Sequence, residues 1–385
     1  MRIALLSWES MYSIYVGGVS NHVSELAAAL VRKGHEIHVF TRMNSGQGLY
    51  DCIEGVHYHR CPFELNSHFI TEMENMCRAF VDALYATEDF SGPFDIVHAH
   101  DWLAANALLW FKEGRRRKSV ITMHSTEYGR SGNNFTGGEA QKISHIEWSG
   151  MYHADKVIAV SNVLKDELNW LYSVPHAKVD VIYNGINCSK FDGWIDSLAV
   201  RKMYGIGPHD PFILFAGRMV YQKGPDLLME SIPQILHHLP KAKFVFGGDG
   251  GMRTYVEEMS RKMGISHATR FLGHVYGWRL TDLFKSADCI CVPSRNEPFG
   301  IVILEAWSAG KPVVASVNGG PAEFVWHEIN GLKVEAQPAS VRWGVNTLLS
   351  DMDHAHWMGH NGRVAAETIF SWDNIADETL AVYSN

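Results

Sequence analysis

The chain has 385 residues, of which 46% are hydrophobic and 20% are charged. One compact core rarely grows beyond about 250–300 residues, so this length predicts two domains, and the composition excludes a disordered or fibrous protein. The net charge of -8 argues against nucleic-acid binding, because the recognition of phosphates needs a basic surface. We therefore expect a globular protein without a nucleic-acid partner.

The apolar segments of the chain are short. No apolar run reaches the roughly 18 residues of a membrane-spanning helix, so we expect no stable membrane insertion. The run at residues 3–6 is soon followed by Glu9 and is too short for a signal peptide. These features predict a cytoplasmic protein.

The first half of the chain alternates apolar, β-branched runs with helical stretches. Expected strands cover residues 2–7, 36–41, 96–100, 119–124, 156–161 and 178–183. Such nearly continuous apolar runs are typical of strands that are buried on both faces. Gly17 and Gly18 form a loop after the first strand, and a helical pattern over 20–33 ends at Gly34. The alternation predicts a parallel sheet covered by helices.

The same pattern restarts in the second half. Expected strands cover residues 211–217, 243–248, 270–273, 289–294 and 311–316, and expected helices cover 225–238, 251–263, 300–309, 338–349 and 355–368. The regularity is weakest at 187–210, where we place the linker. The expected domains are 1–190, with a last helix at 371–385, and 205–370. The fold class is α/β, with two doubly wound, Rossmann-like parallel-sheet domains that face a central cleft.

Two glutamates flank the start of the helix expected at 300–309. Glu297 lies in the preceding loop, and Glu305 lies eight residues later inside the helix. The unpaired amide groups of a helix N-terminus suit a diphosphate, and a nearby carboxylate suits ribose hydroxyls. Solvated surface charge is the alternative interpretation of this spacing.

Two basic residues follow the first strand of the second half. Arg218 can bind phosphate oxygens with two donors, and Lys223 adds a point charge five residues later. Ordinary surface cations would give the same pattern, but a second phosphate-compatible feature in the same domain favours a binding site. No glycine cluster has the G-x-G-x-x-G spacing, which argues against a nicotinamide dehydrogenase.

Histidines end two successive expected strands of the first half. His98 and His100 end one strand and precede Asp101, whereas His124 ends the next strand and precedes Glu127. A histidine at the carboxyl end of a parallel strand can face a ligand, and a buried structural histidine is the alternative. His98 and His100 share a strand face, but we identify no third ligand at metal-binding spacing, so no metal site is predicted.

Together these motifs resemble the retaining glycosyltransferases of family 4, which have the two-domain GT-B fold, and more distantly the glycogen and starch synthases. The resemblance covers nearly the whole chain. The matching segments are Gly17-Gly18, Val97–Trp102, Val157–Ser161, Val181–Asn187, Gly217-Arg218, Lys223-Gly224, Gly247–Gly250, the pair Glu297 and Glu305, and Phe370–Trp372.

The resemblance implies a donor site in the second domain. Glu305 is expected to hold the ribose, and Glu297 the hydroxyls of the donor sugar. Arg218 and Lys223 are expected to neutralise the leaving diphosphate. The donor site also includes Phe299, Gly300 and Ile301 of this domain, together with Gly17 and Gly18 of the first domain.

The resemblance implies an acceptor site in the first domain, with His100 beside the anomeric carbon. The further candidates there are Asp101, His124 and Glu127. Glu297, Arg218 and Lys223 are expected to share in catalysis.

The expected reaction moves a hexosyl group, with glucosyl favoured, from a UDP-, ADP- or GDP-hexose to a carbohydrate acceptor. A glucan or small sugar is favoured over a phosphosugar or lipid as the acceptor. Fixed cations and helix amides stabilise the leaving group, so neither a cofactor nor a metal is expected. No carboxylate nucleophile is evident, which favours retention through attack on the same face of the sugar. The alternatives are a nucleotide-sugar 2-epimerase, a glucan phosphorylase and a non-catalytic sugar-nucleotide sensor.

Overall fold

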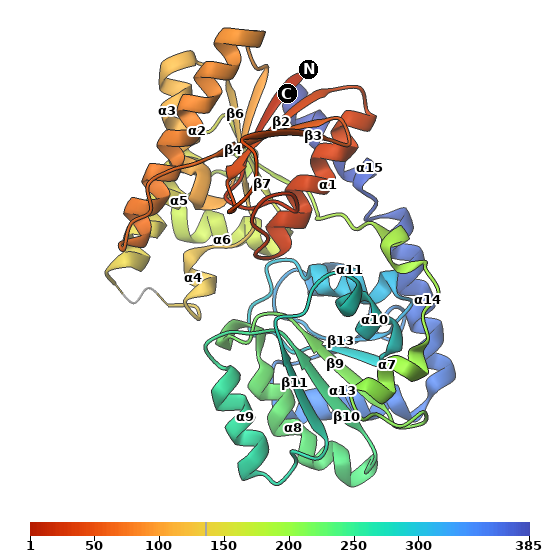
Figure 1. Cartoon of the computed structure of the whole chain (residues 1–385). Coiled ribbons are helices and arrows are strands. Elements are labelled where there is room, and N and C mark those ends of the chain that lie inside the picture. The colour runs from red at the N-terminus through yellow and green to blue at the C-terminus, as the bar shows by residue number, and fades with distance from the viewer. Residues whose placement is uncertain (135–136) are drawn as a thin grey trace. The chain divides into compact units, whose positions relative to one another are not determined.

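The computed structural model describes residues 1–134 and 137–385 and divides into two compact units (Figure 1). Unit 1 comprises Met1–Gly185 and Trp372–Asn385, and unit 2 comprises Ile186–Ser371. The stretch 187–210, which we expected to be a linker, instead belongs to unit 2. Arg201 anchors it there, because its Nη2 lies 2.6 Å from the Oδ1 atom of Asp288.

Unit 1 is built on an eight-stranded sheet in the order β3-β4-β2-β1-β5-β6-β7-β8, in which only the β3–β4 pair is antiparallel. Its strands are β1 (Arg2–Leu6), β2 (Glu36–Arg42), β3 (Tyr50–Ile53), β4 (Val56–Cys61), β5 (Ile96–His100), β6 (Lys118–Met123), β7 (Lys156–Ala159) and β8 (Val179–Val181). Its helices are α1 (Gly18–Arg32), α2 (Phe69–Ser91), α3 (Asp101–Arg115), α4 (Glu127–Arg130), α5 (Glu139–His153), α6 (Asn162–Tyr172) and α15 (Trp372–Ser384).

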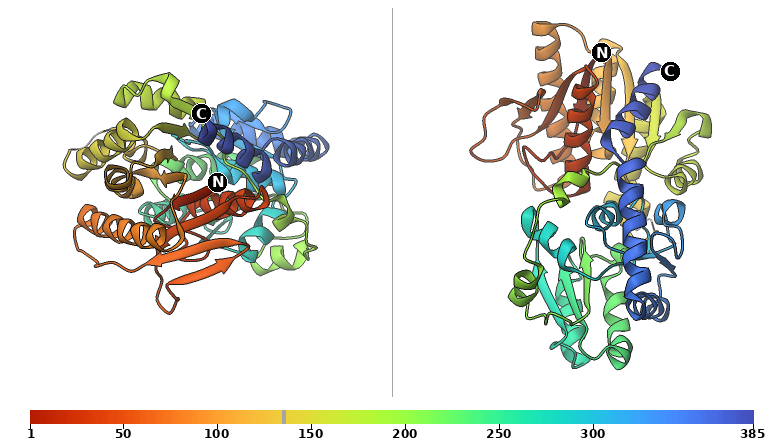
Figure 2. Two further views of the ribbon diagram at one scale, coloured as in Figure 1. Left: turned by 90° about the horizontal axis from the view of Figure 1, so that it is seen from above. Right: turned by 90° about the vertical axis from the view of Figure 1, so that its right-hand side faces the viewer.

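Helices cover both faces of this sheet. Helices α1 and α15 lie side by side on one face, while α2 and α3 pack on the other (Figures 1 and 2). Val23, Leu26 and Leu30 recur at helical spacing along α1 and are all buried against the sheet. The apolar stripe visible in the sequence therefore fixes the face that α1 presents to the core.

The hairpin β3–β4 is absent from the expected elements. Its turn places Glu54 and Gly55 at φ values of 53° and 79°, which a two-residue hairpin of the I′ type requires. Strand β3 is largely exposed, and polar histidines interrupt β4, so neither strand has the continuous apolar run of the central strands. Strands at the edge of a sheet are therefore missed when the sequence is searched for continuous apolar runs.

Unit 2 is built on a six-stranded parallel sheet in the order β11-β10-β9-β12-β13-β14. Its strands are β9 (Phe212–Ala216), β10 (Lys243–Gly247), β11 (Thr269–Gly273), β12 (Cys289–Val292), β13 (Val313–Ser316) and β14 (Leu332–Val334). Its helices are α7 (Ser197–Met203), α8 (Pro225–His238), α9 (Arg253–Lys262), α10 (Trp278–Ser286), α11 (Ile301–Ser308), α12 (Pro321–Phe324), α13 (Pro338–Ser350) and α14 (Met352–Thr368).

Each sheet has one point at which the order of its strands reverses. In unit 1 the reversal lies between β1 and β5, and in unit 2 it lies between β9 and β12. Doubly wound sheets bind ligands beyond the carboxyl ends of the two strands at such a point. The loops that follow these strands therefore define where each unit can hold a ligand.

Both units have the parallel, doubly wound architecture expected from the sequence. Helix α15 comes from the far end of the chain and completes unit 1. Across residues 1–134 and 137–385, we find no helix with the length and apolar character needed to cross a membrane.

Candidate active site

An ion pair joins the two motifs of unit 2. Lys223 ends the short 3-10 turn after β9, and its Nζ atom lies 2.8 Å from each carboxylate oxygen of Glu297, in the loop after β12. Ser294 donates a further hydrogen bond of 3.0 Å to Oε2 of Glu297, which is buried. The structure thus brings Glu297 and Lys223 together at the reversal point of the sheet.

Arg295 fixes the two loops against each other. Its Nη1 and Nη2 atoms bind the two carboxylate oxygens of Asp226 on α8 at 2.9 and 2.5 Å. Nη1 also donates to the carbonyl of Tyr221, and the guanidinium lies 3.9 Å from the centre of that ring. A bidentate ion pair of this kind holds a defined geometry. The contacts of Arg295 therefore help to fix the position of Lys223, in addition to the ion pair that Lys223 forms with Glu297.

Gly319 allows a third loop to approach Glu297. Its φ is 106°, and a Cβ atom there would lie 2.1 Å from the carbonyl oxygen of Glu297. The amide of Gly320 donates to that same oxygen at 2.8 Å, and the amide of Glu297 donates to Asn318 at 3.0 Å. Any side chain at position 319 would displace the Glu297 loop.

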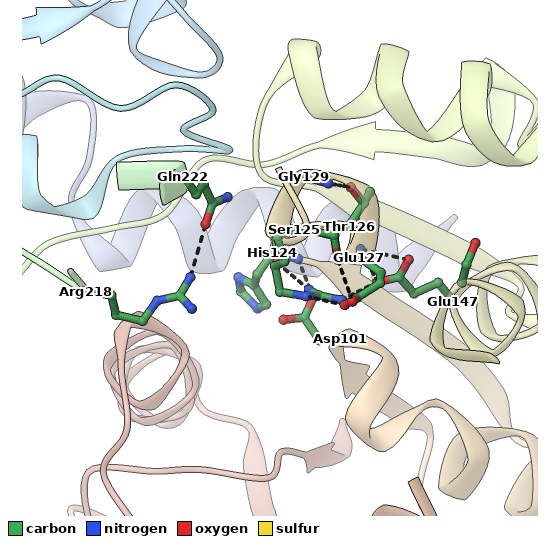
Figure 3. A network of polar contacts seen from close by, with 12 residues as sticks. Asp101, His124, Ser125, Thr126, Glu127, Gly129, Glu147, Arg218 and Gln222 are labelled. Atoms are coloured by element: carbon green, nitrogen blue, oxygen red, sulfur yellow. Dashed lines mark hydrogen bonds and ion pairs between the residues drawn. The ribbon is translucent and has the colours of Figure 1, made fainter. Parts of the chain in front are cut away.

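Arg218 lies on an exposed loop directly after β9. Its Nη2 atom donates to Oε1 of Gln222 at 3.2 Å, as drawn in Figure 3. The neighbouring loop supports this one, because a Cβ atom on Gly248 would lie only 1.9 Å from the carbonyl oxygen of Gly217. Arg218 is thus an accessible cation, and the neighbouring loop packs closely against the backbone that carries it.

Glu305 lies in the second turn of α11 and is only partly exposed. Burial raises the pKa of its carboxyl group to about 7, and Lys190 offsets part of this rise. The carboxyl group therefore changes charge near neutral pH. This property could not be read from its spacing to Glu297.

The start of α11 supplies backbone donors. Gly300 caps the helix at a φ of 104°, and the helix begins at Ile301 rather than at the expected residue 300. The first amides of a helix have no hydrogen-bond partner within the helix, so the first turn of α11, which begins at Ile301, presents backbone donors of the kind that suit an anion.

Histidines gather at the reversal point of unit 1. Helix α1 contributes His22, β5 contributes His100, and His124 follows β6. The ring of His22 lies 5.2 Å from that of His100 and 4.6 Å from that of His124, measured between centroids. Burial holds the pKa of His22 and His100 well below the usual range and lowers that of His124 to about 3.

His100 and His124 differ in accessibility. His100 is fully buried, and its Nδ1 atom lies 3.2 Å from Nε2 of His124, which is partly exposed. His124 is therefore the more accessible of the two rings, and the role expected of His100 stays a prediction.

Asp101 and Glu127 serve the loop after β6. Asp101 is buried at a φ of 59°, and its Oδ1 atom accepts a 2.8 Å hydrogen bond from the amide of His124 (Figure 3). The carboxylate of Glu127 accepts from Arg130 at 3.1 Å and from Ser131 at 2.9 Å. Both carboxylates, expected as acceptor candidates, are thus engaged in shaping the loop.

A buried carboxylate on α5 completes this network. Glu147 accepts hydrogen bonds from the amide of Glu127 at 2.9 Å, from Arg130 at 2.6 Å and from the hydroxyl of Tyr172 at 2.5 Å. Burial raises the pKa of Glu147 to about 7, and Arg130 is the main group that opposes this rise. Glu147 lies mid-helix without a neighbouring motif, so the sequence carries no signal for this role.

Glu9 organises the glycine loop after β1. It is buried, and its Oε2 atom accepts from the amides of Val16 at 2.9 Å and Gly17 at 2.7 Å and from the hydroxyl of Ser20. The loop that ends at Gly17 therefore has a fixed path into α1, and Gly18, which we expected in the loop, is the first residue of the helix.

The chain matches two protein families over most of its length. Residues 16–190 match the family described as Glycosyltransferase Family 4, and residues 197–365 match Glycosyl transferases group 1. An uncharacterized glycosyltransferase of Methanocaldococcus jannaschii is 39% identical over 389 residues, which cover 100% of this chain and 98% of the relative. The chain belongs to the family 4 glycosyltransferases.

Other relatives of this glycosyltransferase have more specific names. A glycogen synthase of Mycobacterium tuberculosis is 29% identical over 399 residues, with 100% of this chain and 94% of the relative covered. A D-inositol 3-phosphate glycosyltransferase of Xylanimonas cellulosilytica is 30% identical over 390 residues, with 96% and 91% covered.

Solved structures confirm the GT-B fold of this glycosyltransferase. Sucrose-phosphate synthase from Thermosynechococcus elongatus superposes with a TM-score of 0.83 at 23% identity, covering 100% of this chain and 98% of that one. Anabaena HepE in complex with UDP-glucose gives a TM-score of 0.79 at 20% identity, covering 100% and 99%. The family and fold expected from the motifs are therefore both confirmed.

Proposed function

We propose that this glycosyltransferase moves a hexosyl group, preferably glucosyl, from a nucleoside-diphosphate sugar held by unit 2 to a carbohydrate acceptor held by unit 1. The observation that carries this proposal is the Lys223–Glu297 ion pair beside Arg218 and the start of α11. Cations and backbone donors there suit a diphosphate, and a carboxylate suits the hydroxyls of the sugar.

The leaving group determines what the donor site must stabilise. Breaking the anomeric C–O bond builds negative charge on the departing diphosphate. Arg218, Lys223 and the first amides of α11 would stabilise that charge without a metal or cofactor. Because Glu297 already pairs with Lys223, Arg218 is the more accessible cation, and Lys223 is shared between Glu297 and the phosphates.

Two carboxylates would bind the remaining parts of the donor, the ribose and the transferred sugar. Glu305 would accept hydrogen bonds from the ribose hydroxyls, and Glu297 would accept them from the hydroxyls of the transferred sugar. The Gly17-Gly18 segment, fixed by Glu9, offers backbone without side chains to the ligand.

Retention follows from attack on the same face of the sugar. The acceptor oxygen forms the new bond to the anomeric carbon as the bond to the diphosphate breaks, and the acceptor proton passes to a departing phosphate oxygen. His124, supported by His100, is the partly exposed side chain that we assign to the reacting sugar.

The relatives support a glucosyl donor without fixing its nucleotide. HepE binds UDP-glucose, and starch synthase IV from Arabidopsis thaliana was solved with ADP and acarbose. A glycogen synthase is among the relatives that align over the whole chain. We therefore favour a glucan or small sugar as acceptor, with UDP-, ADP- and GDP-glucose as the donors to compare.

A donor screen tests the proposal. The release of nucleoside diphosphate is measured for each donor with and without glucan, maltose and inositol phosphate, and the anomeric configuration of the product is read by NMR. We expect release that depends on an acceptor and a product that keeps the donor configuration. An epimerised sugar formed without acceptor, either free or still attached to the nucleotide, would instead indicate a 2-epimerase. Donor binding with neither release nor epimerisation would indicate a sensor.

A further inference from the structure

We propose that His22, His100 and His124 form a binding site for a divalent transition-metal ion, for which Zn²⁺ is the best match. Each residue offers a ring nitrogen, and the three ligand atoms lie within 4.8 Å of one another. Imidazole nitrogen is a preferred ligand of Zn²⁺, and three histidines leave one coordination position open.

Two members of the cluster have the spacing of ligands to one tetrahedral ion, and the third ligand atom lies within 4.8 Å of both. Zn–N bonds of about 2.0–2.1 Å place two ligands about 3.4 Å apart. His100 Nδ1 and His124 Nε2 are 3.2 Å apart, so these two rings need little movement to share an ion.

One ring nitrogen in the cluster lacks a partner and is placed to act as a ligand. Nε2 of His22 is buried and has no hydrogen-bond partner in the part of the chain that the structure describes. His22 Nδ1 lies 2.7 Å from Oδ1 of Asn184, an acceptor that fixes the proton on Nδ1 and leaves the Nε2 lone pair bare. A metal-binding histidine characteristically donates its other ring N–H to such an oxygen.

The surroundings contribute charge and access. The carboxyl group of Asp101 contacts the amide of His124 at 2.8 Å and supplies a negative group beside the cluster. His124 is partly exposed, so an ion from solvent would reach this residue first. His22 and His100 are buried.

A second histidine cluster in unit 1 is a poorer site. It consists of Glu36, His38 and His57. Both ring nitrogens of His38 are already hydrogen-bonded, to His59 and to Glu36, each at 2.9 Å. Arg2 also lies 3.0 Å from Glu36, and its charge opposes that of an ion. The second cluster therefore provides a matched control.

A bound ion would occupy the lone pair of His124. Zn²⁺ is therefore expected to inhibit sugar transfer reversibly and not to support it. This consequence rests on the role proposed for His124, whereas the binding of the ion does not.

The test uses Co²⁺ as a spectroscopic substitute for Zn²⁺, added to full-length protein that has been stripped with a chelator. We expect one equivalent of Co²⁺ to give the intense visible absorption of a tetrahedral complex, and Zn²⁺ to displace it. His22→Asn should abolish this band, and Asn184→Ala should weaken binding about 10–100-fold. His57→Asn should bind like the parent protein. Circular dichroism verifies that each variant is folded.

Two results would overturn the site. One is the absence of a tetrahedral band in the parent protein. The other is parent-like binding by both His22→Asn and Asn184→Ala. For inhibition, the release of nucleoside diphosphate is measured with and without Zn²⁺, and each variant is compared with its own metal-free rate. Zn²⁺ should slow the parent protein at least tenfold and leave His22→Asn unaffected. Binding without inhibition would overturn the consequence drawn for His124 and leave the site itself in place.

Discussion

At the scale of single residues, Glu305 and Glu297 occupy different surroundings, so replacing them should affect different kinetic constants. Glu305 is assigned to the ribose, which does not react, so Glu305→Ala should mainly raise the donor KM. Glu297 is assigned to the transferred sugar, so Glu297→Ala should mainly lower kcat. A hydrogen bond to a charged group contributes about 1.5–3 kcal/mol, so each effect should be at least about tenfold.

Calorimetry with the bare nucleoside diphosphate separates the two roles, because this ligand has a ribose but no sugar to transfer. Glu305→Ala should weaken its binding. Glu297→Ala should bind it at least as tightly as the parent protein, since Lys223 then loses its carboxylate partner. Weaker binding by Glu297→Ala with unchanged binding by Glu305→Ala would reverse the assignment.

Glu305 should also make ribose binding depend on pH. Burial raises its pKa to about 7, and the ionised carboxylate accepts hydrogen bonds from two hydroxyl groups more strongly than the neutral acid does. Affinity for the free nucleoside, which has no phosphate of its own to titrate, should therefore rise as the pH increases from 6 to 8. NMR titration measures this, with Glu305→Gln as the control that should stay flat. A flat profile for the parent protein would contradict the role.

At the scale of elements, Glu9 connects the end of β1 to the start of α1. Replacing it with Ala removes the charged acceptor of the amides of Val16 and Gly17, which are at least partly exposed to solvent. A hydrogen bond contributes roughly 0.5–1.5 kcal/mol net, and water can replace part of the loss at these positions, so Glu9→Ala should lower the free energy of unfolding by about 1–3 kcal/mol. Urea denaturation measures the change.

Glu9→Gln is the matched control, because it keeps one acceptor oxygen and removes the charge. It should lose clearly less stability than Glu9→Ala. Equal stability of Glu9→Ala and the parent protein would show that the glycine loop holds its path without this carboxylate.

At the scale of the whole molecule, the central strands were predictable because parallel strands buried on both faces leave continuous apolar runs. Strands β9 and β12 have this pattern throughout, and β1 has it after Arg2. The edge hairpin β3–β4 was not predictable by the same signal, because its residues are exposed or polar. The linker was misplaced because 187–210 lacks β/α periodicity although it packs within unit 2.

The candidate active site was likewise predictable only in part. Arg218, Lys223 and Glu297 follow strand ends in the sequence, so the topology alone brings them to one edge of the sheet. Glu147 could not be found this way, because it lies in the middle of a helix. Arg295 does follow β12, but its contribution depends on Asp226, which is far away in the chain. The histidine cluster was missed because its third member lies on a helix, away from the two strand ends.

The most direct test of the proposed donor site is the initial rate of nucleoside diphosphate release from the preferred sugar nucleotide, in EDTA and at saturating acceptor. The parent protein should turn over at its full rate, because protein cations and helix amides stabilise the leaving group. Arg218→Ala should be about 100-fold slower, as expected on removing one donor to the transition state. Arg261→Ala, on an exposed position of α9, should match the parent protein. Loss of the parent activity in EDTA with recovery in Mn²⁺, or parent-like turnover by Arg218→Ala, would contradict the account.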